Sequence, residues 1–124
     1  MLLHDACMKP IEAEIADLNR LLPRAILGAS LDANGMLMLT CDGFFVSIQC
    51  EYEIRPSANS GEIDPATVAK LIGIKVESIS AKSVRSTYSD LILTLSNAEI
   101  HAFAPHRGEE LWFIDVPGRA WISP

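Results

Sequence analysis

The side chains best suited to chemistry gather near the C-terminus of this 124-residue chain. His101 and His106 are followed closely by Glu109 and Glu110, and histidine with carboxylate can bind a metal or transfer a proton. A transition-metal site needs three or four convergent ligands, and this spacing brings no three of them together. We therefore predict no catalytic residue, no metal and no cofactor. A small hydrolase using the His101 and His106 region is a third hypothesis, after the two given below.

Cysteine chemistry is the other catalytic option. Cys41 and Cys50 point into the predicted core, where a buried thiol is inert. Cys7 is close to His4 in the sequence, but no third group can be named that would orient a Cys–His pair. Three scattered cysteines without a CxxC motif instead favour reduced thiols in the cytoplasm. The chain also has no GxGxxG, Walker, GxSxG or HExxH motif.

Charge and hydropathy narrow the range of partners. The net charge of −6 disfavours nucleic acid, because phosphate binding needs clustered lysine and arginine. No apolar run approaches the roughly 20 residues of a membrane helix. The start of the chain has no basic region, and Asp5 interrupts its apolar run, so we expect no secretory signal. An acidic protein attracts basic partners, although solubility alone also explains this charge.

The strongest structural pattern lies between Met36 and Ile54. From Phe44 onward apolar residues occupy every second position, which predicts one eleven-residue strand with one buried face. An Asp42-Gly43 turn of type I′ would precede it. This turn makes three apolar pairs on one side of the hairpin: Cys41 with Phe44, Leu39 with Val46, and Leu37 with Ile48.

Upstream of this hairpin we expect a helix and a strand. Apolar residues recur at helical spacing over 9–22, and Pro23 ends the helix. A strand over 25–32 then leads into a three-residue loop, Ala33–Gly35. That loop length pairs Leu31 with Leu37 and keeps the apolar side common to both strands.

The second half repeats this plan. Asp64 should cap a short helix that ends at Gly73 and carries an apolar stripe of Val68, Leu71 and Ile72. A strand over 74–86 should contain a bulge near Glu77-Ser78. A turn at Asn97-Ala98 would set three apolar pairs: Leu95 with Ile100, Leu93 with Ala102, and Leu91 with Ala104.

The predicted fold is α+β and mainly antiparallel β: a six- to seven-stranded meander barrel or sandwich made of two hairpin-based halves, with an N-terminal helix and a short central helix. We expect a single domain over 1–124. Its parts are the helix 9–22, a first β meander 24–55, a loop and short helix 56–73, a second β meander 74–117 and a tail 118–124. Ile26–Leu31 echoes Leu71–Val76, which either duplication or convergence on hairpin chemistry explains.

The remaining candidates are surface residues. Met38, Phe45, Ile92 and Phe103 should face away from the core. Either the helices cover that face, or it is a patch for a partner or a second copy. The exposed acids either meet a basic partner or protect strand edges from aggregation. The residues proposed for partner binding are Phe45, Glu51, Glu53, Glu62, Phe103, Glu109 and Glu110.

Several segments together resemble a known kind of protein. They are Leu27-Gly28, the hairpin from Leu37 to Ile48, Asp64-Pro65, Leu71–Gly73 and Glu110–Ile114. This pattern resembles small bacterial single-domain proteins of unknown function, similar in style to immunity proteins of toxin systems. The resemblance implies a non-enzymatic cytoplasmic binding protein that occludes the site of a cognate toxin. The alternative is a homo-oligomeric β-domain, for example a homodimer, with a structural or small-ligand-binding role.

Overall fold

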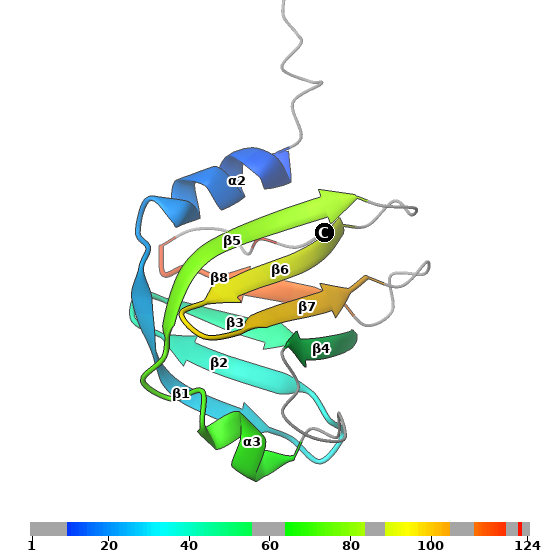
Figure 1. The fold of residues 1–124 in the computed structure, drawn as a ribbon. Coiled ribbons are helices and arrows are strands. Elements are labelled where there is room, and N and C mark those ends of the chain that lie inside the picture. The colour runs from blue at the N-terminus through cyan, green and yellow to red at the C-terminus, as the bar shows by residue number, and fades with distance from the viewer. Residues whose placement is uncertain (1–9, 56–63, 84–88, 105–110, 119–121, 123–124) are drawn as a thin grey trace, which may run out of the picture.

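The main feature of the computed structural model is one antiparallel sheet of eight strands (Figure 1). The structure describes residues 10–55, 64–83, 89–104, 111–118 and 122. The strands are β1 (Arg24–Leu31), β2 (Leu37–Cys41), β3 (Phe44–Ile48), β4 (Glu51–Arg55), β5 (Lys75–Ser83), β6 (Ser89–Leu95), β7 (Glu99–Phe103) and β8 (Trp112–Asp115). Their order in the sheet is β4-β7-β6-β5-β1-β2-β3-β8. The α+β antiparallel class is confirmed, but with eight strands in an open sheet.

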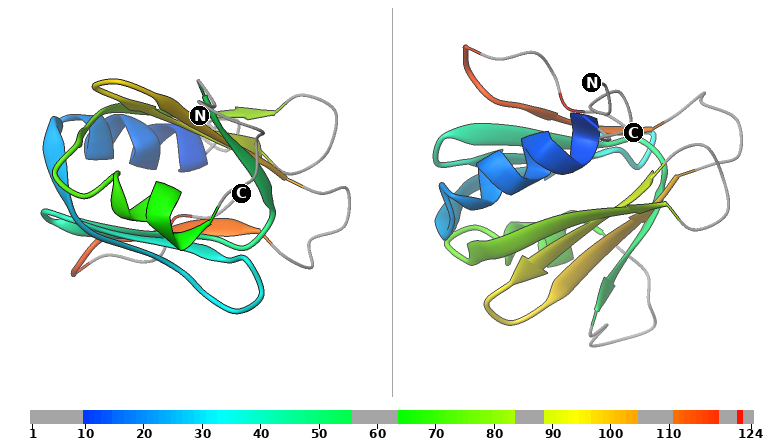
Figure 2. Two further views of the ribbon diagram at one scale, coloured as in Figure 1. Left: turned by 60° about the horizontal axis from the view of Figure 1, so that its bottom comes forward. Right: turned by 90° about the horizontal axis from the view of Figure 1, so that it is seen from above.

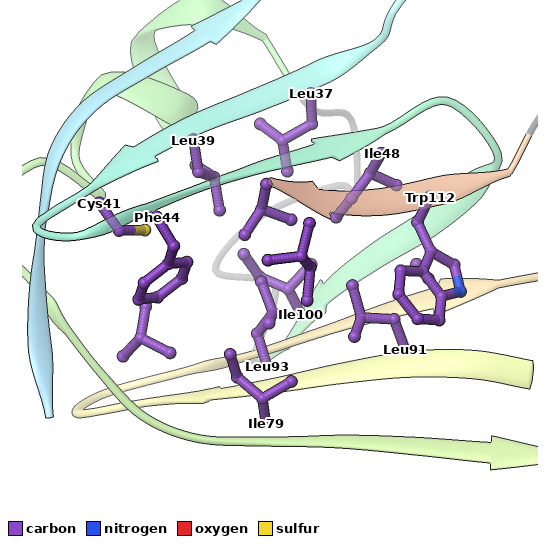
Figure 3. Close-up of a cluster of buried hydrophobic side chains, with 14 of the residues drawn as sticks. Leu37, Leu39, Cys41, Phe44, Ile48, Ile79, Leu91, Leu93, Ile100 and Trp112 are labelled. Carbon is purple, nitrogen blue, oxygen red and sulfur yellow. The ribbon is translucent and has the colours of Figure 1, made fainter. Parts of the chain in front are cut away.

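The sheet bends at β1 into two layers that face each other (Figure 2). β1 pairs with β5 only at Arg24 and Ala25, whereas its pairing with β2 extends to Leu31. Apolar side chains from both layers fill the space between them (Figure 3). Burying one large aliphatic side chain contributes about 1.5–3 kcal/mol. Those with no exposed area include Leu37, Leu39, Val46, Ile48, Leu93, Ile100, Trp112 and Ile114.

The first hairpin has the predicted register but a different turn. Cys41 lies opposite Phe44, as expected. A type I′ turn needs positive φ at both central residues, and glycines are the only described residues with positive φ, including Gly43 at 104°. Asp42 therefore has negative φ, and the signs match a type II turn.

The Ala33–Gly35 loop also behaves as predicted. Leu31 lies opposite Leu37, and Gly35 has a φ of 86°. The carboxylate of Asp32 holds the loop, because its Oδ1 accepts hydrogen bonds from the backbone N–H of Asn34 at 2.8 Å and of Met36 at 2.9 Å.

The alternating run from Phe44 to Ile54 forms two strands, not one. β3 ends at Ile48, and the chain then crosses to the other layer, where β4 begins at Glu51. Alternation continues through the crossing because both layers bury their apolar side in the same core. The hydrophobic pattern therefore could not reveal the break.

In the second half the bulge is confirmed and the hairpin register is not. The pairing of β5 with β6 shifts between Val76 and Ser78. The hairpin turns at 96–97, where the N–H of Leu95 donates to the carbonyl of Ala98 at 2.8 Å. The observed pairs are Leu93 with Ile100 and Leu91 with Ala102. This register differs from the predicted one by two residues, and both keep the same side inward.

The helices are α2 (Pro10–Asn19) and α3 (Pro65–Ala69). Asp64 caps α3 as predicted, because its Oδ1 accepts a hydrogen bond from the N–H of Thr67 at 2.8 Å. Val68 and Leu71 are buried, but Ile72 is 49% exposed and does not belong to the predicted apolar stripe. No helix in the described residues is long and apolar enough to cross a membrane.

Each helix lies across an opening between the two layers (Figure 2). α2 packs mainly on β5 and α3 mainly on β1. Of the two alternatives for the outer sides of β3 and β7, cover by the helices is not found in the part of the chain that the structure describes. Both strands carry a half-buried phenylalanine there, Phe45 and Phe103.

The two halves are related by an internal twofold pattern. In this pattern β1 corresponds to β5, β2 to β6, β3 to β7 and β4 to β8. Exchanging corresponding strands reverses the strand order of the sheet but leaves every pairing intact. The registers agree as well, since Leu39 faces Val46 just as Leu93 faces Ile100. Each half gives its last strand to the other layer: β4 pairs with β7 and β8 pairs with β3. The bulges in β1 and β5 match when Ile26 is aligned with Val76. The sequence comparison aligned Ile26 with Leu71 instead, so its alignment of the two halves was wrong by five residues.

An asparagine side chain takes the place of a strand where β5 separates from β1. The N–H of Ile79 donates to Asn19 Oδ1 at 2.9 Å, and Asn19 Nδ2 donates to the Ile79 carbonyl at 2.7 Å. The same amide also donates to the carbonyl of Ile15 within α2. Asn19 thus anchors α2 to β5 and satisfies backbone groups that β1 does not reach.

Replacing Asn19 with alanine should therefore destabilise the fold. Loss of the amide leaves the N–H and carbonyl of Ile79 without partners, which we expect to lower the free energy of unfolding by about 1–3 kcal/mol. Asn97→Ala, in an exposed turn, should change it by less than about 0.5 kcal/mol. Urea denaturation followed by circular dichroism measures both, and equal midpoints for the two variants would contradict this role.

Candidate functional site

The outer side of β4 and β7 brings acidic and aromatic side chains together; we call it the β4–β7 face. It comprises Glu51 and Glu53 on β4, His101 and Phe103 on β7, and Asp90 on β6. Glu51 lies opposite Phe103, and Glu53 lies opposite His101. Because β4 ends the sheet, its two glutamates are exposed. This face is the candidate functional site.

His101 is the organising side chain of the β4–β7 face. Its imidazole stacks on the ring of Phe103, with centroids 4.1 Å apart and planes 15° from parallel. Its Nε2 lies 3.0 Å from Asp90 Oδ2, and Asp90 Oδ1 accepts a hydrogen bond from the N–H of Ala104 at 2.9 Å. The two partners are each less than one-fifth exposed. The stacked pair is thus held in one orientation.

The exposed charges around this pair include two cations. Lys82 lies opposite Asp90 on β5, and the Nε of Arg55 donates to Glu53 Oε1 at 2.9 Å. This hydrogen bond and the carboxylate charge of Glu53 raise the pKa of Arg55. Glu99 lies opposite Arg55 on β7. One guanidinium therefore faces two carboxylates, and Glu51 has no such cation opposite it on β7.

The structure brings together only some of the predicted binding residues. Glu51, Glu53 and Phe103 share the β4–β7 face. Phe45 lies on the outer side of the other layer, opposite Thr40 and Asp115. Because the two layers face each other, Phe45 and Phe103 lie on opposite sides of the molecule. The other candidates lie outside the described residues: Cys7, His4, Glu62, His106, Glu109 and Glu110.

Sequence reasoning missed Asp90 because it placed the second hairpin in the wrong register. In the predicted register His101 faces Thr94, far along β6 from Asp90. In the observed register His101 faces Ile92, so Asp90 is the diagonal neighbour on the same side. A correct turn assignment at 96–97 would have exposed this pair.

The described residues offer little for catalysis. They contain no group of three His, Cys, Asp or Glu side chains that could hold a metal ion. Within the described part of the chain, the His101 ring is hydrogen-bonded to Asp90 and to no hydroxyl or thiol. A general base without a nucleophile or ligand set beside it does not define a reaction.

Cys41 and Cys50 are buried in the core, as predicted. Burial raises the pKa of the Cys41 thiol from 9.0 to about 12. The protonated thiol thus favours the folded state, fully below pH 9 and decreasingly as the pH rises towards 12. At neutral pH the thiolate that a nucleophile requires is absent.

We therefore expect Cys41 to resist alkylation in the folded chain. At pH 8 iodoacetamide should label Cys41 at least about 100-fold more slowly in the folded protein than in guanidinium, because only the thiolate reacts. Peptide mapping by mass spectrometry separates Cys41 from the other two cysteines. Comparable rates in both states would show that this thiol is accessible and ionised.

Comparisons with protein-family models, with curated proteins and with solved structures give no match.

Proposed function

We propose that this chain is a non-enzymatic cytoplasmic binding protein, most concretely an immunity protein that neutralises a bacterial toxin by covering its basic site. The β4–β7 face is its binding surface. The observation that carries the proposal is the edge strand β4, which pairs with β7 alone among the described residues and whose exposed glutamates flank the stacked His101–Phe103 pair. The fold by itself implies no function.

Two physical features support a basic protein partner. The exposed glutamates of β4 are aligned along one side of an edge strand, and the whole chain carries a net charge of −6. Such a surface attracts a positively charged partner and accelerates encounter. The stacked rings of His101 and Phe103 add a rigid, half-buried centre, and aromatic centres with polar rims are typical of binding hot spots.

An edge strand offers a second means of recognition. Among the described residues β4 pairs with β7 alone, so its other side can receive an extended segment of a partner. Tyr52 and Ile54 point inward while Glu51, Glu53 and Arg55 point outward. An added strand would therefore meet carboxylates on the outer side, which favours lysine or arginine at alternate positions of that segment.

Charge on an edge strand has another explanation, and the two can be separated. Any charge, positive or negative, discourages strand-to-strand aggregation. If that is its sole role, Glu53→Lys is harmless because lysine protects an edge equally well. If the charge recruits a basic partner, the same substitution opposes binding.

The test is capture of a partner from the native host, identified by mass spectrometry. We expect the wild-type chain to retain a basic protein that elutes as NaCl rises from about 50 to about 500 mM, because salt screens exposed charges. Glu53→Lys should weaken its affinity by about tenfold or more. If the partner is a toxin, an equimolar amount of this chain should abolish its activity.

Glu77→Lys provides the matched control. Glu77 is also exposed and lies on β5, three strands away from β4. Its substitution by lysine changes the net charge by the same amount as Glu53→Lys. The Glu77→Lys variant should retain the partner at wild-type affinity. If both variants bind the partner equally weakly, the effect of Glu53→Lys is one of net charge alone. If both bind it with wild-type affinity, the β4–β7 face does not contact the partner.

A further inference from the structure

The outer side of β1, β2, β3 and β8 carries large apolar side chains; we call it the β2–β3 face. These side chains are Leu27, Met38, Phe45 and Phe113. Leu27 lies in the bulge of β1 and is 60% exposed, more than any other large apolar side chain that the structure describes. Met38 and Phe45 are half-buried. Among the described elements, neither helix lies on this side of the layer (Figure 2).

Strand pairing sets most of these side chains in two rows across the sheet. Each row has a hydroxyl next to large apolar side chains, and the carboxylate of the first row lies on the last strand. The rows are Thr40, Phe45 and Asp115, and Met38, Ser47 and Phe113. The β2–β3 face is therefore largely apolar and nearly uncharged.

The internal twofold pattern shows that the fold does not require apolar side chains at these positions. Leu27 corresponds to Glu77, because each is the extra residue of its bulge. In the same way, two phenylalanines of the β2–β3 face correspond to glutamates of the other layer: Phe45 to Glu99, and Phe113 to Glu53. Packing within the chain thus does not explain the three apolar side chains, whereas contact with another surface does.

The charge distribution favours a second copy of this chain as the occupant. The chain has a net charge of −6, and its exposed glutamates on β4 lie on the opposite side of the molecule. A basic partner is attracted to those carboxylates and not to a nearly uncharged face. Two acidic copies repel each other least when their uncharged faces meet and their acidic faces point away.

The interior of the molecule already contains this kind of packing. There one four-stranded layer faces the corresponding layer of the other half across apolar side chains (Figure 2). Sheets with the same twist pack face to face about 10 Å apart. A twofold axis in the interface would bring the same patch of each copy together.

We propose that two copies of this chain associate through the β2–β3 face, with Leu27 and Phe45 of each copy between the two sheets. The acidic β4–β7 faces then lie on the two outer sides of the dimer. The proposal does not depend on the immunity function, because the two surfaces lie on opposite sides of the molecule.

The size of the face predicts a weak dimer. Four strands about 4.8 Å apart and five residues of about 3.4 Å each give a flat area of roughly 300 Å². A stable interface buries about 800 Å² on each partner. We therefore expect a dissociation constant on the order of 100 µM.

Sedimentation equilibrium of the purified chain tests the association directly. Between about 10 µM and about 1 mM the mean mass should rise from that of a monomer towards that of a dimer, since this range spans the expected Kd. Raising NaCl from about 50 to about 500 mM should strengthen the dimer, because salt screens repulsion between two acidic chains. The same increase should release the basic partner proposed above, so the two interactions are distinguishable.

The internal twofold pattern supplies a matched pair of variants. Thr40 and Thr94 are both exposed and occupy corresponding positions on β2 and β6. Thr40→Glu places a charge in the centre of the β2–β3 face and should weaken the dimer by about tenfold or more. Thr94→Glu adds the same charge to the other layer and should stay within about twofold of wild type.

A second substitution guards against an effect of folding. Leu27→Glu introduces the residue that the second half carries as Glu77, and it should also weaken the dimer by about tenfold or more. Urea denaturation followed by circular dichroism checks that each variant is folded.

Three results would overturn the proposal. One is a monomer mass for the wild-type chain up to about 1 mM, ten times the expected Kd. Another is equal or greater weakening by Thr94→Glu than by Thr40→Glu, which would attribute the effect to net charge or to the other layer. The third is a dimer of wild-type affinity in both Thr40→Glu and Leu27→Glu, which would place the interface elsewhere on the chain.

Discussion

The exchange of strands between the two layers is the constraint on which the rest of the structure depends. β4 leaves the first half to pair with β7, and β8 leaves the second half to pair with β3. Neither layer is complete without a strand from the other half. Both halves therefore contribute to the core between the layers, which includes Val46 and Ile100. Neither meander can bury its apolar side alone.

The same exchange decides where the open edges lie. β4 and β8 end the sheet because each is the last strand added to its layer. β8 carries Trp112 and Ile114, both buried, and its outer neighbour is Ile122, which forms a bridge with Ile114. β4 instead presents exposed Glu51 and Glu53. One edge is thus tied to a further apolar residue, whereas the other carries two exposed carboxylates.

The internal twofold pattern makes the differences between the halves informative. Residues that match, such as Leu39 and Leu93, serve the core. Residues that do not match mark places where one half departs from the shared plan. The hydrogen bond between His101 and Asp90, for example, has the contact between Ser47 and Met36 as its counterpart. In that counterpart the Ser47 hydroxyl contacts the thioether of Met36, so one half has a carboxylate where the other has a thioether.

Alternation determined from sequence alone which side of the two hairpins is buried, because side chains in a strand point to opposite faces with period two. It also set the first hairpin register, since the Asp42-Gly43 turn and the apolar pattern agree there. It could not distinguish the two registers of the second hairpin, because a shift of two residues leaves the same side inward. Asp90 was missed for that reason.

Only the tertiary structure decided which layer each strand joins. The run from Phe44 to Ile54 reads as one strand because both layers bury their apolar side in a common core. No local pattern marks the crossing, so the chain alone could not separate Phe45 from Phe103 or place Glu53 beside His101. Those neighbours depend on strand pairing between distant segments, which is set by the packing of the whole core.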